Sequence, residues 1–464
     1  MLASLGTLFI ALSCFATSNA NRLKLSEVET RFAQSAAFTS TEKALESLQL
    51  DYQSRDLVLE PTLSFTAQSI RDRRETFSSS AKSQTQDFDL TLEKPFSTGT
   101  TFTLNPSIDQ SRYPSQSPQN RGTAEWRLGL SQNLWQDAFG RSTRLRRERE
   151  RNEWLQQRAL IQLKRARLLV DMESLYWDFA LAIREAELRE RNVKRGQEIL
   201  QWMKSRLARS AAENTDYLQA QALLATRKLQ LEVVQQSLTQ LKLKLHRYFS
   251  PMDWQPDPDE LARRRPVESL VVSWPENSGT SPQPLEFHAS NGETEAARIK
   301  ARETRESIRP KLSLELAYGK NAIDTTAGTA ARHSVEEEHE YGAIGLTLKT
   351  GLGLADEWRK VEAANAAVRS AELARESLQQ ESQVAWPRLM QNLEAYHKRV
   401  DQAHELVKIQ EAKAVADRKR FRMGRATAFE SITFEQDAAE AEIALWSLYA
   451  QLRKAEAEAR LFAR

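Results

Sequence analysis

Two very long helical stretches constrain the fold of this chain more than any other feature of its sequence. Residues 138–207 and 354–421 are dense in Glu, Arg, Lys, Gln, Leu and Ala, and they contain no glycine or proline except Gly140, Gly196 and Pro387. Each stretch is about 70 residues long, which corresponds to about 100 Å of α-helix. No single globular domain needs a helix of that length, so an elongated helical structure is expected.

The apolar residues within both stretches follow a heptad-type spacing. In the second stretch they are separated by 4, 3, 4, 3, 4 and 7 residues, and the first stretch repeats the pattern. The positions are Leu389, Leu393, Tyr396, Val400, Ala403, Val407 and Ala414 in the second stretch, and Met172, Leu175, Phe179, Ile183 and Ala186 in the first. This spacing predicts helices that pack lengthwise on neighbours, as in a coiled coil or a helical barrel.

Each long stretch ends at a short break, after which a second helix is expected. The first break, at 206–215, is followed by a predicted helix at 215–248, and the second break, at 420–427, is followed by one at 428–462. Gly424 is suited to the left-handed conformation that ends a helix, and Asn214 or Thr215 is suited to capping the next one. The sequence therefore predicts two tight helical hairpins.

Alternating apolar and polar residues occupy 62–132 and 311–349, ahead of the long helices. Leu63, Phe65 and Ala67 are typical of this pattern, which predicts strands with one apolar and one polar face. The apolar face is either the core of a soluble sandwich or the lipid-facing wall of a membrane barrel whose polar face lines water. The strands alone leave both possibilities open, and the two long helical hairpins favour the membrane protein.

The order of these elements occurs twice, which indicates an internal duplication. Residues 21–250 and 288–464 each contain a helix, strands, a long helix, a hairpin and a second helix, and the first helix of each half ends at Pro61 or Pro310. Residues 251–287 hold seven of the fourteen prolines and show no long periodic pattern. We expect this segment to be a linker that wraps around the outside of the helices.

The first twenty residues are typical of a secretory signal peptide. An apolar run is followed by Ser18, Asn19 and Ala20, a small-x-small cleavage pattern, although the positive segment that usually precedes such a run is missing. Cys14, the only cysteine, lies in this run and is either removed with the signal peptide or lipidated. If it is removed, the mature chain has neither disulfides nor thiolate metal sites.

Charge and histidine placement argue against nucleic-acid binding and catalysis. The chain has 66 basic and 63 acidic residues, a net charge of +3, and no basic block with interleaved aromatic residues. The six histidines are scattered, and no nucleophile, general base or metal-ligand set converges. We expect no catalytic residue, no cofactor and no bound metal, and no nucleic-acid partner.

One cluster combines histidines and carboxylates, which are residue types that can bind metals. It comprises His333, Glu336, Glu337, Glu338 and His339. The pair of histidines four residues apart that zinc helices use is missing, so a solvated extracellular loop is expected, with weak divalent-ion binding as the alternative.

Two tryptophans and two arginine-rich runs flank the predicted strands. Trp126 and Trp135 are either interfacial residues of a membrane barrel or core residues of a helix–strand junction. The runs 144–151 and 302–309 are expected to be solvated helix faces, with contact to lipid phosphate groups as the alternative.

The ordered set of elements resembles the TolC-like outer-membrane efflux protein family, over nearly the whole mature chain. Two local motifs add to the order of elements: Leu-Gly-Leu-Ser-Gln-Asn-Leu-Trp at 128–135, and Arg-Phe-Arg-Met-Gly-Arg-Ala-Thr at 420–427. The resemblance implies a mixed α and β membrane protein, a homotrimer in which a shared transmembrane β-barrel continues into a long periplasmic α-helical barrel. It also implies a Gram-negative outer-membrane location and a periplasmic adaptor protein that links the duct to an inner-membrane pump.

The resemblance also implies residues at a periplasmic gate. By position these are Asp216, Phe421, Gly424 and Glu430, and the adaptor-contacting hairpin tips are Arg209, Ser210, Met423, Gly424 and Arg425. Carboxylates repeated by threefold symmetry in a narrow pore would attract cations. Thr433 stands where the family often has a second acid, which leaves the selectivity of the entrance open.

An additional hairpin at 87–108, with its turn at 97–100, departs from the family pattern. If its strands joined the barrel, the barrel would exceed the usual twelve strands, and a hairpin that protrudes from the barrel is expected instead.

These observations predict a passive exit duct for an efflux pump or a type I secretion system, opened at its hairpins by an adaptor. The alternative is an exported coiled-coil structural or adaptor-like protein with a small soluble β-domain. A tube lined by mixed polar residues records little about its cargo, so drugs, metal ions and secreted proteins all remain open.

Overall fold

The computed structural model describes residues 21–71, 84–113, 119–209, 212–263, 265–272, 282–336, 339–351, 353–423 and 425–463. The predicted signal peptide, with Cys14, lies outside the described residues, as do Ser210 and Gly424. The chain forms two compact units, one made of residues 1–44, 161–285 and 380–464 and the other of residues 45–160 and 286–379. We call them the helical unit and the sheet unit, and the predicted division into two sequence repeats stays a prediction.

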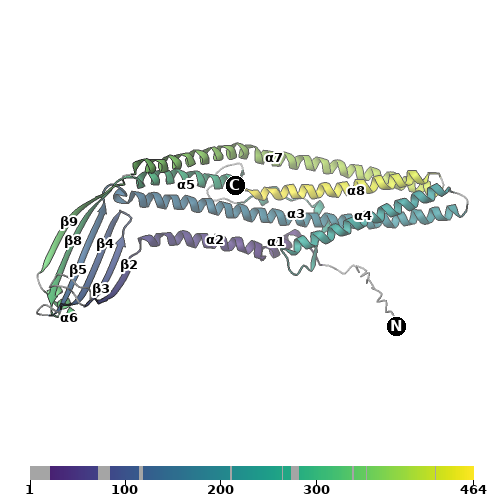
Figure 1. The fold of residues 1–464 in the computed structure, drawn as a ribbon. Helices are drawn as coiled ribbons and strands as arrows, with labels where there is room; N and C mark the ends of the chain where they lie inside the picture. Colours follow the sequence, from purple (N-terminus) through teal and green to yellow (C-terminus); the bar gives the residue numbers. More distant parts are fainter. Residues whose placement is uncertain are drawn as a thin grey trace, which may run out of the picture. The chain divides into compact units, whose positions relative to one another are not determined.

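The sheet unit contains a six-stranded, fully antiparallel sheet (Figure 1). Its strands lie in the order β2-β3-β4-β5-β8-β9. They are β2 (Thr62–Arg71), β3 (Gln84–Pro95), β4 (Thr100–Arg112), β5 (Asn120–Asn133), β8 (Lys311–Asp324) and β9 (Glu340–Lys349). Each pair of neighbouring strands in this order forms an antiparallel ladder.

The expectation of a protruding hairpin at 87–108 is wrong. Its two strands, β3 and β4, lie inside the sheet, where β3 pairs with β2 and β4 pairs with β5. The register runs from Thr62 opposite Glu93 to Arg71 opposite Gln84, and β4 is paired along its whole length with β5. Length comparison between the two halves could not reveal this, because ladder hydrogen bonds to distant strands decide where a hairpin lies.

Helices of the sheet unit pack closely beside one another. Helix α5 (Leu285–Ser307) approaches α3 (Arg141–Leu207) at Gly292, where an added Cβ would lie 2.9 Å from the backbone nitrogen of Gln156. The Tyr52 ring of α2 (Ala36–Ser54) stacks on Trp154 with 5.4 Å between centroids. A glycine is required at 292 because the two backbones leave no room for a side chain.

Two of the apolar cores of the helical unit lie along its helices. Helix α1 (Leu25–Ala33), the later part of α3 and α4 (Asn214–His246) bury the first core, which includes Phe32, Met172, Trp177 and Leu245. The later part of α7 (Leu354–Arg422) and α8 (Ala428–Ala457) bury the second. The second core contains the heptad positions Leu389, Leu393, Val400 and Val407, which confirms that the predicted seam is buried.

Short strands tie the linker to both ends of the chain within the helical unit. Strand β1 (Asn21–Leu23) pairs in parallel with β6 (Trp254–Pro256), and β10 (Phe462–Ala463) pairs with β7 (Gln283–Pro284). The proline-rich linker also contains two 3₁₀ turns, Pro258–Ala262 and Val267–Leu270. Its described part is therefore ordered by backbone pairing.

Within the described part of the chain, no helix combines the length and the apolar character that crossing a bilayer requires.

Candidate functional site

One face of the six-stranded sheet is apolar from edge to edge. The register places Leu63 opposite Leu92, Phe102 opposite Leu130, and Leu316 opposite Ile344, so apolar side chains of adjacent strands share a face. The face comprises Leu63, Phe65 and Ala67 of β2, Phe88, Leu90 and Leu92 of β3, Phe102, Leu104 and Ile108 of β4, Trp126, Leu128 and Leu130 of β5, Leu312, Leu314, Leu316 and Tyr318 of β8, and Ile344, Leu346 and Leu348 of β9. We call this set the apolar sheet face.

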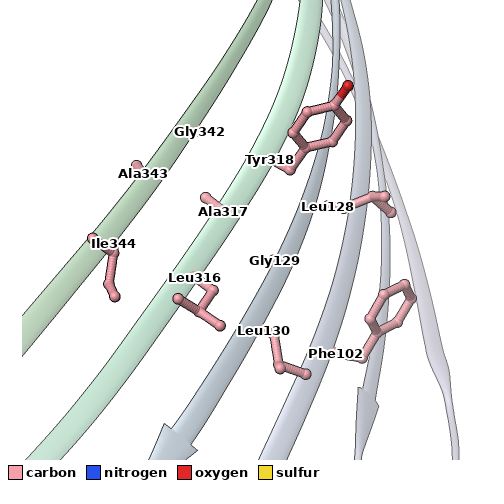
Figure 2. Close-up of a pocket in the computed structure, with 10 residues that line it drawn as sticks. All are labelled: Phe102, Leu128, Gly129, Leu130, Leu316, Ala317, Tyr318, Gly342, Ala343 and Ile344. Atoms are coloured by element: carbon pink, nitrogen blue, oxygen red, sulfur yellow. The ribbon is translucent and has the colours of Figure 1, made fainter.

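Much of the apolar sheet face is exposed. Leu63 is 67% exposed and Ile344 is 76% exposed, and Phe65, Phe88 and Leu346 are exposed as well. Figure 2 shows the centre of the face, where Phe102, Leu128, Leu130, Leu316, Tyr318 and Ile344 line one shallow depression. A contiguous apolar surface of this kind marks an interaction with lipid or with another protein surface.

The opposite face of the sheet is polar. Its residues include Ser64, Thr66 and Gln68 of β2, Asp87, Asp89 and Thr91 of β3, Thr103, Asn105 and Ser107 of β4, Glu125 and Arg127 of β5, Glu315 of β8, and Tyr341 and Thr347 of β9. Carboxylate, amide and hydroxyl groups on one face can be solvated only if water reaches that face. The sheet is thus amphipathic across all six strands, and we call this second set the polar sheet face.

A polar cluster crosses β8 on the polar sheet face. Arg127 Nη2 lies 2.9 Å from Glu125 Oε1, and the Tyr341 hydroxyl donates to the same oxygen over 2.7 Å. The two strands concerned are separated by β8, and Gly319 is the β8 residue paired with both Arg127 and Tyr341. A Cβ on Gly319 would lie 2.7 Å from the Tyr341 ring, so the glycine makes room for the tyrosine to reach across.

A short helix covers one end of the apolar sheet face. Helix α6 (Ala327–Glu336) accepts a 3.2 Å hydrogen bond from Trp126 Nε1 at the Ser334 carbonyl, and the Trp126 ring packs edge-on against Tyr318. The expectation of a loop at His333 is wrong, because His333 and Glu336 lie in α6. His333 Nδ1 lies 3.1 Å from Asp324 Oδ2, and no group of three potential metal ligands occurs among the described residues, which leave out Glu337 and Glu338.

The junction between β5 and α3 exposes aromatic side chains. Trp135 is 48% exposed and Phe139 is 64% exposed, so the core interpretation of Trp135 is wrong. Phe139 has φ of 50° and Asp137 has φ of 56°, which is uncommon for residues other than glycine. Asp137 Oδ1 accepts from the Ser142 backbone N–H over 2.7 Å and so supports the start of α3. Backbone strain at an exposed aromatic residue is typical of a functional contact.

Two arginines of the run at 144–151 pair with carboxylates. Arg149 Nε lies 2.7 Å from Glu303 and its Nη1 lies 2.7 Å from Glu153, while Arg146 lies 3.9 Å from Glu150. These contacts favour a structural role over lipid-phosphate binding for Arg146 and Arg149.

The two helical hairpins of the helical unit pack against each other around Phe421. This gate candidate is buried, and its ring lies 3.9 Å from that of Trp202 between centroids. Met203 and Ala220 complete the cluster. Trp202 was missed from the sequence, because a tryptophan on a long helix carries no sign of its distant partner.

The two carboxylates among the predicted gate residues, Asp216 and Glu430, lie in the first turns of helices. Asp216 is half-buried at the start of α4. Glu430 forms a capping box with Thr427, in which the Thr427 N–H donates to Glu430 Oε2 over 3.1 Å and the Glu430 N–H donates to Thr427 Oγ1 over 3.2 Å. The predicted cap at Asn214 or Thr215 is wrong, because Glu213 precedes α4 without a side-chain cap.

Of the expected hairpin-tip residues, Arg209, Met423 and Arg425 are exposed. Ser210 and Gly424 lie outside the described residues.

A charged cluster close to the hairpins joins four helices. Glu435 of α8 lies 3.2 Å from Arg195 of α3 and accepts a 2.8 Å hydrogen bond from Arg418 Nε of α7. Arg227 of α4 donates to the Asn192 carbonyl over 2.8 Å, and burial lowers the pKa of its guanidinium. Because Glu435 and Arg227 are both buried, these contacts hold the hairpins in one arrangement.

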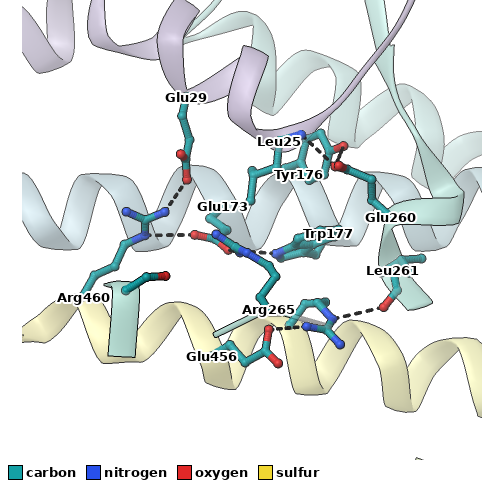
Figure 3. A network of polar contacts seen from close by, with 12 residues as sticks. Leu25, Glu29, Glu173, Tyr176, Trp177, Glu260, Leu261, Arg265, Glu456 and Arg460 are labelled. Carbon is teal, nitrogen blue, oxygen red and sulfur yellow. Dashed lines mark hydrogen bonds and ion pairs between the residues drawn. The ribbon is translucent and has the colours of Figure 1, made fainter. Parts of the chain in front are cut away.

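A second charged network, also missed from the sequence, lies around Glu173 (Figure 3). Glu173 is fully buried and accepts from Trp177 Nε1 over 3.2 Å, from Arg460 Nε over 3.0 Å, and from Arg265. Arg460 also pairs with Glu29, whose pKa is raised by burial against the effect of Arg460. The network ties α1, α3, the linker and the end of the chain together, and its charges are matched within the protein.

No family model and no curated protein matches the sequence. Three structural neighbours are the outer membrane protein VceC of Vibrio cholerae, CusC, whose structures concern transmembrane channel formation, and the open-state outer membrane channel MtrE of Neisseria gonorrhoeae. VceC superposes with a TM-score of 0.65 at 15% identity over 94% of both chains. CusC gives 0.65 at 13% identity over 96% of this chain and 95% of its own, and MtrE gives 0.62 at 15% over 94% and 87%.

The chain thus has the fold of outer-membrane channel proteins along nearly its whole length. The resemblance to TolC-like proteins, stated from the order of sequence elements, is confirmed for the fold. Identities of 13–15% establish shared architecture and leave function to be argued from the sheet and the hairpins.

Proposed function

We propose that this protein is a passive exit duct in the Gram-negative outer membrane, serving an efflux pump or a type I secretion system. The observation that carries the proposal is the amphipathic sheet, whose apolar sheet face is exposed and whose polar sheet face is continuous over the same six strands. The apolar sheet face would contact lipid hydrocarbon, and the polar sheet face would contact water in a pore. The shared fold with outer-membrane channels supports the same assignment.

The assembly that fits this function is a homotrimer. Three sheets would form one transmembrane β-barrel, and the long helices would form an α-helical barrel that extends into the periplasm. Among the described strands, β2 and β9 have no neighbour on their outer edges, and this supports assembly because an exposed strand edge is a template for pairing with another chain. The two similar halves of the sequence fit an internal duplication in this architecture.

Gating would occur at the helical hairpins. Phe421 and the Glu435 cluster hold the hairpins together in the structure described here, and Asp216 and Glu430 lie at the starts of the helices that follow the hairpin turns. A periplasmic adaptor protein that binds the exposed tips, including Arg209 and Arg425, would separate the hairpins and open the entrance. Transport energy would come from an inner-membrane pump, and the duct itself would catalyse no reaction.

Planar-bilayer conductance, measured alongside the oligomeric mass of the purified protein, tests the proposal. Discrete channels from a trimer are expected. A soluble species that forms no channels would overturn the proposal and make an exported coiled-coil scaffold with a soluble β-domain the better description.

A further inference from the structure

We infer that the pore wall contains eighteen strands, with the β3–β4 hairpin of each chain built into it and with β2 of one copy paired to β9 of the next. This inference rests on the proposed trimeric duct and specifies the width of its outer-membrane part. Six strands per chain in three chains give this number.

The hairpin has the side-chain pattern of the rest of the wall. Leu92 lies opposite both Leu63 of β2 and Leu104 of β4, and Phe88 lies opposite both Ala67 and Ile108. Its apolar residues therefore extend the apolar sheet face without interruption. A hairpin that projected into water from a barrel rim would have no reason to alternate in phase with its neighbours.

The outer edges of β2 and β9 are the edges that a second copy can pair with. In the described sheet β2 pairs only with β3, and β9 pairs only with β8. All adjacent strands are antiparallel, and the number of strands is even, so β2 and β9 run in opposite directions. Joining β9 of one copy to β2 of the next therefore continues the antiparallel alternation around a closed ring.

The two edges match when they pair over their full length. Both strands have ten residues, and complete antiparallel overlap places Arg71 opposite Glu340, which brings opposite charges together. The same register places Leu63 opposite Leu348 and continues the apolar sheet face from copy to copy. A slip of one residue would turn the apolar side chains of one strand onto the polar sheet face, so only even shifts keep the pattern.

The added hairpin sets the width of the pore wall. For a strand spacing of about 4.8 Å and a tilt of about 40°, a ring of eighteen strands has a backbone radius of about 18 Å. A ring of twelve strands, which the chain would form without β3 and β4, has a radius of about 12 Å on the same assumptions. The cross-section enclosed by the wall is thus about 2.2 times larger, in the range where barrels leave an aqueous channel.

Electron cryo-microscopy of the trimer in lipid nanodiscs, with the strands counted in cross-section, tests the inference directly. Eighteen strands are expected for the full chain, and a variant that lacks residues 84–113 is expected to show twelve. A trimeric channel whose full chain shows twelve strands, with the hairpin outside the wall, would overturn the inference and leave the proposed function standing. Absence of both trimers and channels would overturn the two together.

Thiol labelling in lipid vesicles gives a second measurement that needs no deletion variant. Asp89→Cys lies on the polar sheet face and Leu90→Cys on the apolar sheet face of β3, and Glu315→Cys and Leu316→Cys are the matched pair in β8. A water-soluble maleimide is expected to label the first member of each pair at least about tenfold faster, because the second lies in hydrocarbon. Equal labelling in β3 with a tenfold difference in β8 would mean that the hairpin is outside the wall.

Cysteine cross-linking tests the closure between copies. In the full-length register Thr66 of β2 lies opposite Gly345 of β9, and a Cβ on Gly345 meets no neighbouring atom. The double variant Thr66→Cys with Gly345→Cys is expected to give a covalent trimer ladder under oxidation, whereas each single variant gives none. If no even-shifted pair of these strands cross-links in a channel-forming trimer, the proposed closure is wrong.

Discussion

Replacing Leu316 with arginine tests whether the apolar sheet face meets lipid. Leu316 is the sixth residue of β8, about 17 Å along the strand from Lys311 at about 3.4 Å per residue. With a tilt of about 40° this is about 13 Å along the barrel axis, close to the middle of an apolar band about 25 Å tall. An arginine at the bilayer midplane costs about 2–4 kcal/mol per chain, which lowers the folding equilibrium constant by about 30-fold to 700-fold.

The matched control is Ala317→Arg, which puts the same side chain on the polar sheet face. The residues paired with Ala317 are Gly129 and Ala343, so the new side chain has room and water. Denaturant unfolding in phospholipid vesicles, followed by tryptophan fluorescence, should show a large loss of stability for Leu316→Arg and little change for Ala317→Arg. Equal, small effects of both variants would refute the lipid-facing assignment, because an arginine on a water-exposed face carries little penalty.

Three further predictions concern the Glu173 network, a half-buried histidine of the sheet unit and the gate. Glu173→Gln should lower the free energy of unfolding by about 3–5 kcal/mol, because it removes the charge of a fully buried carboxylate that pairs with the partly buried Arg265 and Arg460. Glu394→Gln, which breaks an exposed pair, should leave the denaturation midpoint nearly unchanged. Burial lowers the pKa of His288 in the folded chain, so on acidification the unfolded chain binds the proton first. The free energy of unfolding should therefore decrease as the pH falls below about 6.5. A series of thermal melts at decreasing pH should show a smaller decrease in melting temperature for His288→Gln than for the unmodified chain. Asp216→Ala combined with Glu430→Gln, which keeps a capping side chain, should raise single-channel conductance, and unchanged conductance and cation preference would remove these two groups from the gate.

The long helices and the faces of the strands follow from local sequence patterns. The heptad spacing at Leu389, Leu393 and Val400 correctly indicates which side of α7 is buried, because residues on one helix side recur at fixed intervals. The alternation at Leu63 and Phe65 likewise predicts an apolar strand face, because side chains of a strand point alternately to its two faces.

Partners that are distant in the chain could not be predicted in this way. Trp202 packs on Phe421, and Arg460 pairs with Glu173, across more than two hundred residues in each case. No local period of either helix distinguishes these side chains from other tryptophans and arginines of the same stretches. Functional residues proposed by resemblance, such as Glu430, can also have a local structural role that the alignment of elements does not reveal.

The sequence by itself determined the two long helices, the strands and the amphipathic character of the sheet, since each depends on periodicity over neighbouring residues. Only the tertiary structure decided that the hairpin at 87–108 belongs to the sheet, that α6 covers Trp126, and that buried charges join the helices. The physical reason is that these features depend on which hydrogen-bond donors and acceptors meet across the fold, and a strand edge or a buried carboxylate is compatible with many partners until the chain has folded.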